Sequence, residues 1–219
     1  MSSFYLKLIG IITMLIDHIG LLFYDETILR IIGRISFPIF AYQASLSYRY
    51  TKNIKKHFIK LSIFAIISQI PYYLMTKEIG FHFNILFTIL LGQLSIYLYN
   101  KFNNLFDKIL YLLLICILGI CLRVEYSCIG ILTIFFFYQY KDNKIKSYLS
   151  FIILFTIYYL IYYIFNKEIN NIYLLIGTIS SLIPISLYNN KEGIKLKYFF
   201  YIFYPLHMII LYLIALYIK

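Results

Sequence analysis

The stretch YFFYIFYPLHMIILYLIALYI, from Tyr198 to Ile218, decides which kind of fold this chain adopts. It carries no charged residue and, at about 1.5 Å per residue, is long enough to cross a hydrocarbon core of about 30 Å as a helix. Its apolar residues run continuously instead of alternating with polar ones, so a helix fits better than a membrane β-strand. The stretch therefore predicts a transmembrane helix.

Comparable apolar stretches recur along the whole chain. Hydrophobic residues make up 62% of the sequence and charged residues only 13%, which lies outside the range of soluble domains. We predict an all-α, polytopic transmembrane bundle that forms one domain over residues 1–219 and crosses the membrane about nine times, within a range of about eight to ten. The predicted spans are Phe4–Tyr24, Ile28–Tyr48, His57–Met75, Phe83–Tyr99, Ile109–Leu122, Tyr126–Tyr140, Tyr148–Phe165, Ile172–Tyr188 and Tyr198–Ile218.

The chain has a net charge of +11, and the positions of its basic residues indicate a membrane topology. Basic residues concentrate in every second connection, and such connections stay on the cytoplasmic side. This places the N-terminus in the cytoplasm and favours membrane lipid, not nucleic acid, as the electrostatic partner. The basic residues of these inner connections are Arg49, Lys52, Lys55, Lys56, Lys60, Lys101, Lys108, Lys141, Lys144, Lys146, Lys191, Lys195 and Lys197; the outer connections carry Lys77, Lys167, Asp25, Glu26, Glu78 and Glu168 among others.

Three details refine this topology. The fourth, fifth and sixth spans are short, so we expect one of them to be re-entrant or broken. The first span is interrupted by Asp17 and His18 and has no cleavage site after it, so it is expected to remain as a membrane helix. The cysteines Cys116, Cys121 and Cys128 lack metal-ligand spacing and are interpreted as buried packing residues.

Ionisable side chains inside apolar helices are the candidates for function, because each costs several kcal/mol unless it is paired or hydrated. Asp17 and His18 lie in the outer half of the first span, and Arg30 and Arg34 share one face at the start of the second, where Pro38 is expected to kink the helix. Polar residues at a similar predicted depth in other spans are Gln69, Asn84, Thr88 and His207.

Neighbouring residues on a helix point about 100° apart, so Asp17 cannot orient His18. We hypothesise that Asp17 pairs with Arg34 or His207 across a helix interface, and that His18 faces a solvated cavity as a general base. Interhelical hydrogen bonding explains the same polar residues without catalysis, and snorkelling explains the arginines. His57 and His82 are expected to be solvated in connections.

Known soluble-enzyme motifs are absent from the sequence: there is no P-loop, dinucleotide-binding glycine pattern, HExxH or GxSxG. This argues against ATP-driven and zinc-protease chemistry, and no metal site is predicted.

Five stretches together resemble the TraX family of bacterial inner-membrane proteins, which is named for the acetylase that modifies the N-terminus of conjugative pilin. Between Asn100 and Lys197 the likeness is weak, apart from Glu125-Tyr126 followed by Gly130, where the family tends to have an Asp-Tyr-Gly pattern. The stretches are LKLIGIITMLIDHIG (Leu6–Gly20), LRIIGRISFPIFAYQASLSYRYT (Leu29–Thr51), IISQIPYYL (Ile66–Leu74), NILFTILLG (Asn84–Gly92) and YFFYIFYPLHMIILYLI (Tyr198–Ile214).

The resemblance implies a multi-pass acetyltransferase of the bacterial cytoplasmic membrane that uses acetyl-CoA. Asp17, His18, Arg34, Asn84 and His207 match polar positions of the family motifs. It implies transfer from cytoplasmic acetyl-CoA to an amine or hydroxyl near the outer leaflet, on a peptide, a pilin-like protein or a glycan. The CoA phosphates would be held by Arg49, Lys52, Lys55 and Lys56.

The sequence is compatible with several alternatives. Transfer is either direct, with His18 as base and Arg34 or Asn84 stabilising the oxyanion, or passes through an acetyl-imidazole on His18 or His207. A proton-coupled transporter is a second functional class; its expected mark is a pair of broken helices in an internal repeat, and no such repeat is visible in the sequence. A non-catalytic pilus or envelope assembly factor is a third.

Overall fold

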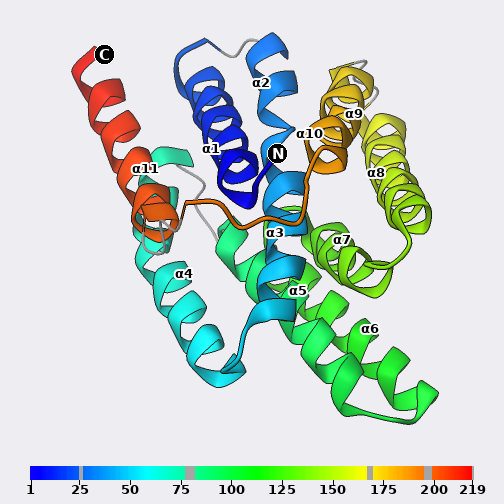
Figure 1. Ribbon diagram of the computed structural model, residues 1–219. Coiled ribbons are helices and arrows are strands. Elements are labelled where there is room, and N and C mark those ends of the chain that lie inside the picture. The colour runs from blue at the N-terminus through cyan, green and yellow to red at the C-terminus, as the bar shows by residue number, and fades with distance from the viewer. Residues whose placement is uncertain (25–26, 77–81, 167–169, 195–198, 219) are drawn as a thin grey trace. The chain divides into compact units, whose positions relative to one another are not determined.

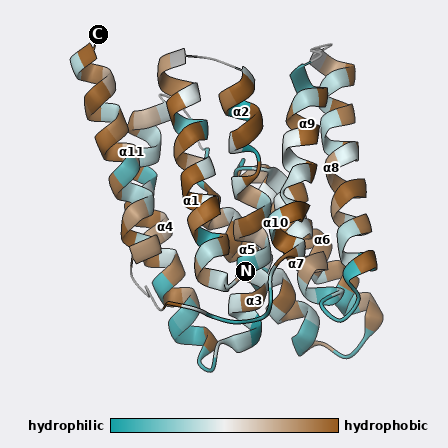
Figure 2. Ribbon diagram, turned by 45° about the horizontal axis from the view of Figure 1, so that its top comes forward, coloured by the Kyte–Doolittle hydropathy of each residue, from teal (hydrophilic) through white to brown (hydrophobic). Residues whose placement is uncertain are grey.

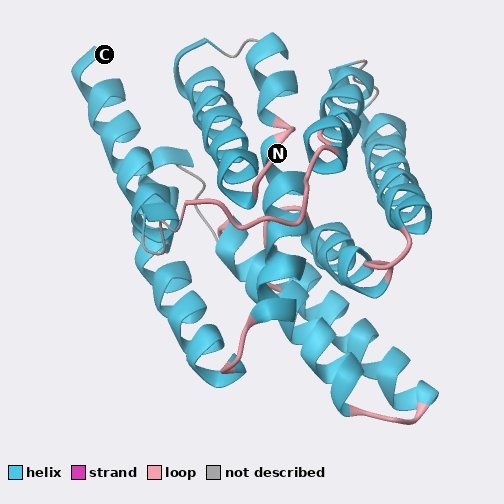
Figure 3. Ribbon diagram, viewed as in Figure 1, coloured by secondary structure: helices cyan, strands magenta, loops and turns pink. Residues whose placement is uncertain are grey.

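Helices make up nearly all the regular structure in the computed structural model, which describes residues 1–24, 27–76, 82–166, 170–194 and 199–218 (Figures 1 and 3). Within these ranges there is no β-strand, and one isolated parallel bridge joins Phe83 to Val124. The all-α prediction is therefore confirmed. In chain order the helices are α1 Ser3–Ile19, the π-helix η1 Gly20–Tyr24, α2 Thr27–Gly33, α3 Ser36–Tyr50, α4 Ile54–Thr76, α5 Ile85–Lys101, α6 Leu105–Cys121, α7 Ser127–Gln139, α8 Lys144–Asn166, α9 Asn170–Ser180, α10 Leu182–Ser186 and α11 Phe199–Ile218.

The chain divides into two compact units. The first unit contains Met1–Gln43 and Ile152–Lys219, and the second contains Ala44–Phe151. Helices α3 and α8 each begin in one unit and end in the other. The expectation of one domain over the whole chain stays a prediction.

Four helical stretches of the described chain are long and apolar enough to cross a membrane: Ser3–Phe23, Ile54–Thr76, Lys144–Phe165 and Phe199–Ile218. Figure 2 shows hydrophobic residues along most of α8 and α11. The count of about nine crossings and the cytoplasmic N-terminus stay predictions. Part of the topology signal lies outside the described residues, namely Asp25, Glu26, Lys77, Glu78, Lys167, Glu168, Lys195 and Lys197.

Two of the predicted spans are broken, but they are not the short ones. The second span divides into α2 and α3 at Arg34 and Ile35, and the eighth divides into α9 and α10 at Ser181. The expected kink at Pro38 is wrong: the break comes earlier, and Pro38 occupies the first turn of α3, where its missing N–H costs little. By contrast, α5, α6 and α7 are each continuous, although the 13 residues of α7 extend only about 20 Å.

Asparagine side chains define where four helices begin. Their side-chain oxygens accept hydrogen bonds from backbone N–H groups that have no partner within the first helical turn. The bonds join Asn53 to the N–H of Lys56 in α4, Asn84 to Leu86 in α5, Asn104 to Phe106 in α6, and Asn143 to Lys146 in α8. An asparagine shortly before an apolar run was therefore a usable boundary signal in this sequence.

The second unit is held together by close packing of α5, α6 and α7. Gly92 and Gly119 allow this approach, because an added Cβ would lie 2.6 Å from Ile134 Cδ1 and 2.4 Å from Ile131 Cδ1, respectively. Small residues at helix contacts are the usual means of packing inside a bilayer, where apolar burial gives no driving force. The buried cluster here includes Leu91, Ile115, Cys116, Val124 and Ile131.

The three cysteines are free thiols in different surroundings. Cys116 is buried in the cluster just described, as predicted, and Cys128 is half-buried. Cys121 is exposed, so its assignment as a buried packing residue is wrong. It is the last residue of α6, where the helix end leaves its side chain uncovered.

Candidate functional site

Helix α1 presents two adjacent polar residues to two different neighbours. Asp17 turns toward α2 and forms ion pairs with Arg30 and Arg34, whereas His18 turns toward α11 and contacts His207. The divergence follows from the 100° between successive side chains of a helix. All of these residues belong to the first unit.

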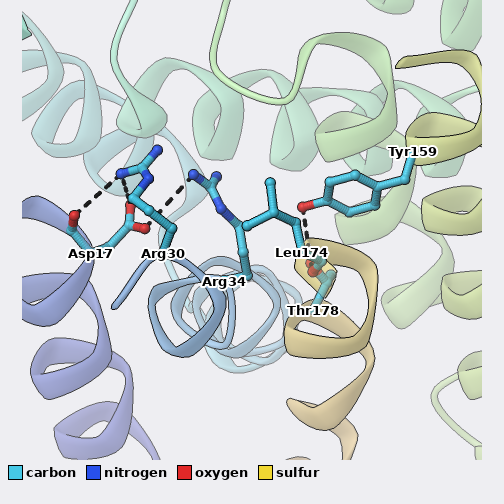
Figure 4. A network of polar contacts seen from close by, with 6 residues as sticks. All are labelled: Asp17, Arg30, Arg34, Tyr159, Leu174 and Thr178. Atoms are coloured by element: carbon cyan, nitrogen blue, oxygen red, sulfur yellow. Dashed lines mark hydrogen bonds and ion pairs between the residues drawn. The ribbon is translucent and has the colours of Figure 1, made fainter. Parts of the chain in front are cut away.

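Asp17 is paired with two arginines from the region of α2. Its Oδ2 lies 3.0 Å from Arg30 Nη1 and its Oδ1 lies 3.7 Å from Arg34 Nη2 (Figure 4). Arg30 also donates to the backbone carbonyl of Asp17 at 3.2 Å. The three side chains are only 17–23% exposed, so removing the carboxylate would leave largely buried cations uncompensated at a cost of about 3–5 kcal/mol.

Glycines make this close approach sterically possible. A Cβ on Gly33 would lie 2.2 Å from both Cβ and Oδ1 of Asp17, so any larger residue would push α2 away from α1. A Cβ on Gly20 would lie 2.7 Å from Cβ of Leu29. Gly33 therefore belongs to the site although it carries no side chain.

The backbone is irregular on both sides of this ion-pair cluster. Immediately after His18 and Ile19, the chain winds into the π-helix η1, a conformation that is rare and often found at functional sites. Arg34 lies in the break between α2 and α3. Ser36, just after that break, donates from its Oγ to the carbonyl of Gly10 at 2.9 Å. This bond connects the start of α3 to α1.

His18 and His207 form the second polar contact. Nδ1 of His18 lies 2.8 Å from Nε2 of His207, and Nδ1 of His207 lies 2.8 Å from the carbonyl oxygen of Phe203. His207 is only 4% exposed, while His18 is half-buried. By whole-residue exposure, His207 is therefore the more deeply buried member of the pair.

A buried tyrosine lies beside Arg34. Thr178 Oγ1 donates its only hydrogen to the carbonyl of Leu174 at 2.9 Å, so the Tyr159 O–H donates to Thr178 across 3.1 Å. This bond joins α8 to α9, and Figure 4 shows Tyr159 on the opposite side of Arg34 from Asp17.

In the second unit, the side chains of Asn84 and Gln69 form a hydrogen-bond network with each other and with backbone groups. Asn84 Nδ2 donates to the carbonyl of Ala65 and to Gln69 Oε1, both at 2.8 Å, while its Oδ1 caps α5. Gln69 Nε2 donates to the carbonyl of His82 at 2.7 Å. Both amide hydrogens of Asn84 are thus used within the protein, which favours a structural role over oxyanion binding.

Thr88 holds a loop with unusual backbone angles. Its hydroxyl donates to the carbonyl of Glu125 at 2.6 Å, and the adjoining Phe83–Val124 bridge holds the same segment. Arg123, Tyr126 and Ser127 all have left-handed φ angles, between 47° and 58°. Non-glycine residues adopt this region at a cost of about 1–2 kcal/mol each, so the loop depends on these anchors.

His57 is not simply solvated, contrary to the sequence prediction. Its Nε2 lies 2.7 Å from Oε1 of Gln93, a residue that is 1% exposed. Gln93 Nε2 in turn donates to Ala44 O and Ser47 Oγ, each at 2.9 Å, which joins three helices of the second unit. Around the same helix ends, Arg49, Lys52, Lys55 and Lys56 are exposed, and their role toward CoA phosphates stays a prediction.

The structure thus sorts the predicted polar residues into two sets. Asp17, His18, Arg34 and His207 come together in the first unit, whereas Gln69, Asn84 and Thr88 lie in the second. Of the two proposed partners of Asp17, Arg34 is correct and His207 is wrong, since His207 pairs with His18. The sequence analysis did not single out Gly33 or Tyr159 and did not propose Arg30 as a partner of Asp17; for Gly33 and Arg30, the RIIGR motif, with glycine between two arginines, was the available signal.

These observations define a helical membrane protein with a paired-histidine and arginine–aspartate centre inside apolar helices. The chain belongs to the TraX family, whose model, described as TraX protein, matches residues 2–215. It is a bacterial membrane protein by its family and its apolar helices.

Two curated proteins illustrate its relationships. One is an uncharacterized protein of Rickettsia prowazekii (strain Madrid E), 33% identical over 159 residues, which covers 69% of this chain and 61% of the relative. The other is named "Probable fimbrial assembly protein FimC, serogroup H1", from Dichelobacter nodosus, and is 24% identical over 96% of this chain and 94% of its own length. No solved structure matches the chain at a significant level.

Proposed function

We propose that this protein is a multi-pass acetyltransferase of the bacterial cytoplasmic membrane, which moves an acetyl group from acetyl-CoA to an amine or hydroxyl at or near the outer leaflet. The observation that carries the proposal is the 2.8 Å contact between His18 and His207 within otherwise apolar helices. Membership of the TraX family supports the same reaction class. The name of the Dichelobacter relative supports a pilin-like protein as one acceptor, beside other peptides and envelope glycans.

The centre supplies the two functions that acyl transfer requires. His18 removes a proton from the acceptor as its nitrogen or oxygen attacks the thioester carbonyl carbon, and returns that proton to the departing CoA sulfur as the C–S bond breaks. A guanidinium stabilises the negative charge that develops on the carbonyl oxygen. Arg34 fits this second role better than Asn84, because the amide hydrogens of Asn84 are already engaged.

Acetyl-CoA is the acyl donor in this proposal, and its phosphates are bound by the exposed cluster of Arg49, Lys52, Lys55 and Lys56. Changing all three lysines to glutamine is expected to raise KM for acetyl-CoA about tenfold and to make KM less dependent on salt, because the attraction is electrostatic. Steady-state kinetics at several ionic strengths measure both effects. The matched control is Lys144→Gln with Lys146→Gln, two exposed lysines in the first turn of α8; an equal rise in KM in both variants contradicts the assignment.

The direct test of the reaction uses the full chain in lipid nanodiscs. Purified protein is incubated with radiolabelled acetyl-CoA and three acceptor classes: peptides with a free N-terminus, pilin-like proteins and envelope glycans. We expect label in one class and a stoichiometric release of free CoA thiol. Neither label transfer nor thiol release with any acceptor class would overturn the proposal.

A transporter is a second candidate, and one observation favours it. The broken segments α2–α3 and α9–α10 meet in the first unit, where a Cβ on Gly177 would lie 2.2 Å from the carbonyl oxygen of Ile31. Discontinuous helices of this kind form binding sites in transporters. Proton flux into proteoliposomes, lost on changing Asp17 to Asn, would favour this function; a non-catalytic assembly factor would show neither flux nor acetyl transfer.

A further inference from the structure

The hydrogen bonds of His207 contain information about where the protons lie on the histidine pair. Both ring nitrogens of His207 are engaged: Nδ1 faces the carbonyl oxygen of Phe203 and Nε2 faces Nδ1 of His18, each at 2.8 Å. A carbonyl oxygen only accepts hydrogen bonds, so the Nδ1 of His207 must carry a hydrogen and donate it. The backbone of α11 therefore fixes the tautomer of a neutral His207.

The tautomer of His207 determines which ring nitrogen of His18 carries the proton. In neutral His207 the remaining nitrogen, Nε2, is an acceptor, so His18 Nδ1 must be the donor in the contact between the rings. A neutral His18 then has its lone pair on Nε2. The single fixed acceptor, the carbonyl of Phe203, thus determines which nitrogen of His18 is basic, through two imidazole rings.

The apolar surroundings of the pair favour the neutral form of both imidazoles. Both histidines lie in helices apolar enough to span a membrane, and an extra cation there costs several kcal/mol. Arg30 and Arg34 already place two guanidinium groups around the neighbouring Asp17. Charging one imidazole would add a third cation to this environment.

The ring geometry suits a directed hydrogen bond. The planes of His18 and His207 differ by only 3°, and the ring centroids are 5.0 Å apart. With the nitrogens only 2.8 Å apart, the two rings meet edge to edge, and the lone pair of His207 Nε2 points along the N–H of His18. The Phe203 ring lies parallel to His207 within 6°, which restrains rotation of the imidazole.

We propose that His207 is a positioning residue that fixes the proton of His18 on Nδ1 and so makes His18 Nε2 the reactive nitrogen of the site. The proposal rests on the acetyltransferase function. Of the two histidines that could carry an acetyl group, it assigns this role to His18 and not to His207. If the reaction passes through a covalent intermediate, the Nε2–acetyl bond forms on His18 as the C–S bond of the thioester breaks, and CoA leaves as thiolate. The acceptor then attacks that acetyl carbon, the Nε2–acetyl bond breaks, and the proton of the acceptor neutralises the thiolate.

The proton positions are measured by NMR on the full chain in lipid, with histidine labelled by ¹⁵N. The chain has only four histidines, so spectra of the single variants His57→Gln and His82→Gln assign the remaining signals to the pair. We expect a protonated Nδ1 and an unprotonated Nε2 on both His18 and His207, with a coupling between His18 Nδ1 and His207 Nε2 across the hydrogen bond. A His18 that is predominantly protonated at Nε2 overturns the proposal.

Variants of His207 separate positioning from mere packing. In His207→Gln the side-chain oxygen still accepts from His18 Nδ1, whereas in His207→Leu no acceptor remains. We expect Leu to shift His18 toward the Nε2-protonated tautomer and to lower kcat by roughly 10²-fold, and Gln to restore much of both. Equal tautomer populations in the two variants contradict the proposal.

The two proposals fail in different ways. Absence of acetyl transfer with the expected tautomers removes the enzymatic function and leaves the proton assignment standing. Acetyl transfer with the opposite tautomer removes the role of His207 and leaves the function standing.

Discussion

Changing His18 to alanine is expected to lower kcat/KM for acetyl transfer by about 10²–10⁴-fold, the usual contribution of a positioned general base. The ion pairs of Asp17 with Arg30 and Arg34 do not involve the imidazole, so the variant should fold. His207 would keep its bond to the carbonyl of Phe203 but would lose its contact with His18. The rate is measured with radiolabelled acetyl-CoA in nanodiscs, alongside the thermal unfolding of the same preparation.

The matched control for this experiment is His82→Ala. The side chain of His82 is removed, but its carbonyl still accepts from Gln69 Nε2. We expect this variant to transfer acetyl groups at the wild-type rate. Undiminished transfer by His18→Ala would show that another group acts as the base.

Changing Gly33 to alanine is expected to destabilise the protein by about 3–5 kcal/mol, which is the cost of separating a buried carboxylate from its cations. The added methyl would lie 2.2 Å from both Cβ and Oδ1 of Asp17, so α1 and α2 must move apart. That movement lengthens the 3.0 Å pair with Arg30 and the 3.7 Å pair with Arg34. Thermal unfolding in detergent measures the loss of stability, and acetyl transfer should fall with it.

Gly10→Ala gives a comparison at another contact of α1, the one with α3. Its added Cβ would lie 3.1 Å from the ring of Phe40 and 3.2 Å from Ile39 Cγ2, side chains that can yield by a few tenths of an ångström. Overpacking of about 1–3 kcal/mol is partly offset by the helix preference of Ala over Gly, about 1 kcal/mol, so we expect a smaller loss than at Gly33. A loss at Gly33 no larger than the loss at Gly10 would mean that α2 adjusts freely and that Asp17 does not require this close approach.

The local rules of the sequence account for much of the fold. Long uncharged runs such as Tyr198–Ile218 could be assigned as helices, because only a helix satisfies the backbone of an apolar segment in lipid. Asparagines such as Asn84 and Asn104 mark helix starts through bonds to residues two positions away. The candidate site residues were identifiable because ionisable groups are rare and costly in such segments.

The positions of the helix breaks were harder to predict from the sequence. A kink was predicted at Pro38, yet the helix breaks at Arg34 and Ile35. The reason lies in contacts with another helix: Ser36 binds the carbonyl of Gly10, and Asp17 holds Arg34. Intrinsic propensity is a weak predictor where such tertiary bonds are available.

By itself, the sequence determined that this chain is helical and apolar, that Asp17 and His18 diverge, and that a few polar residues carry its chemistry. Only the tertiary structure decided that Asp17 joins Arg30 and Arg34, that His18 joins His207, and that Gly33 is required between α1 and α2. The physical reason is that composition and helical period follow from neighbours along the chain, whereas each pairing depends on which helix faces meet and how closely they approach.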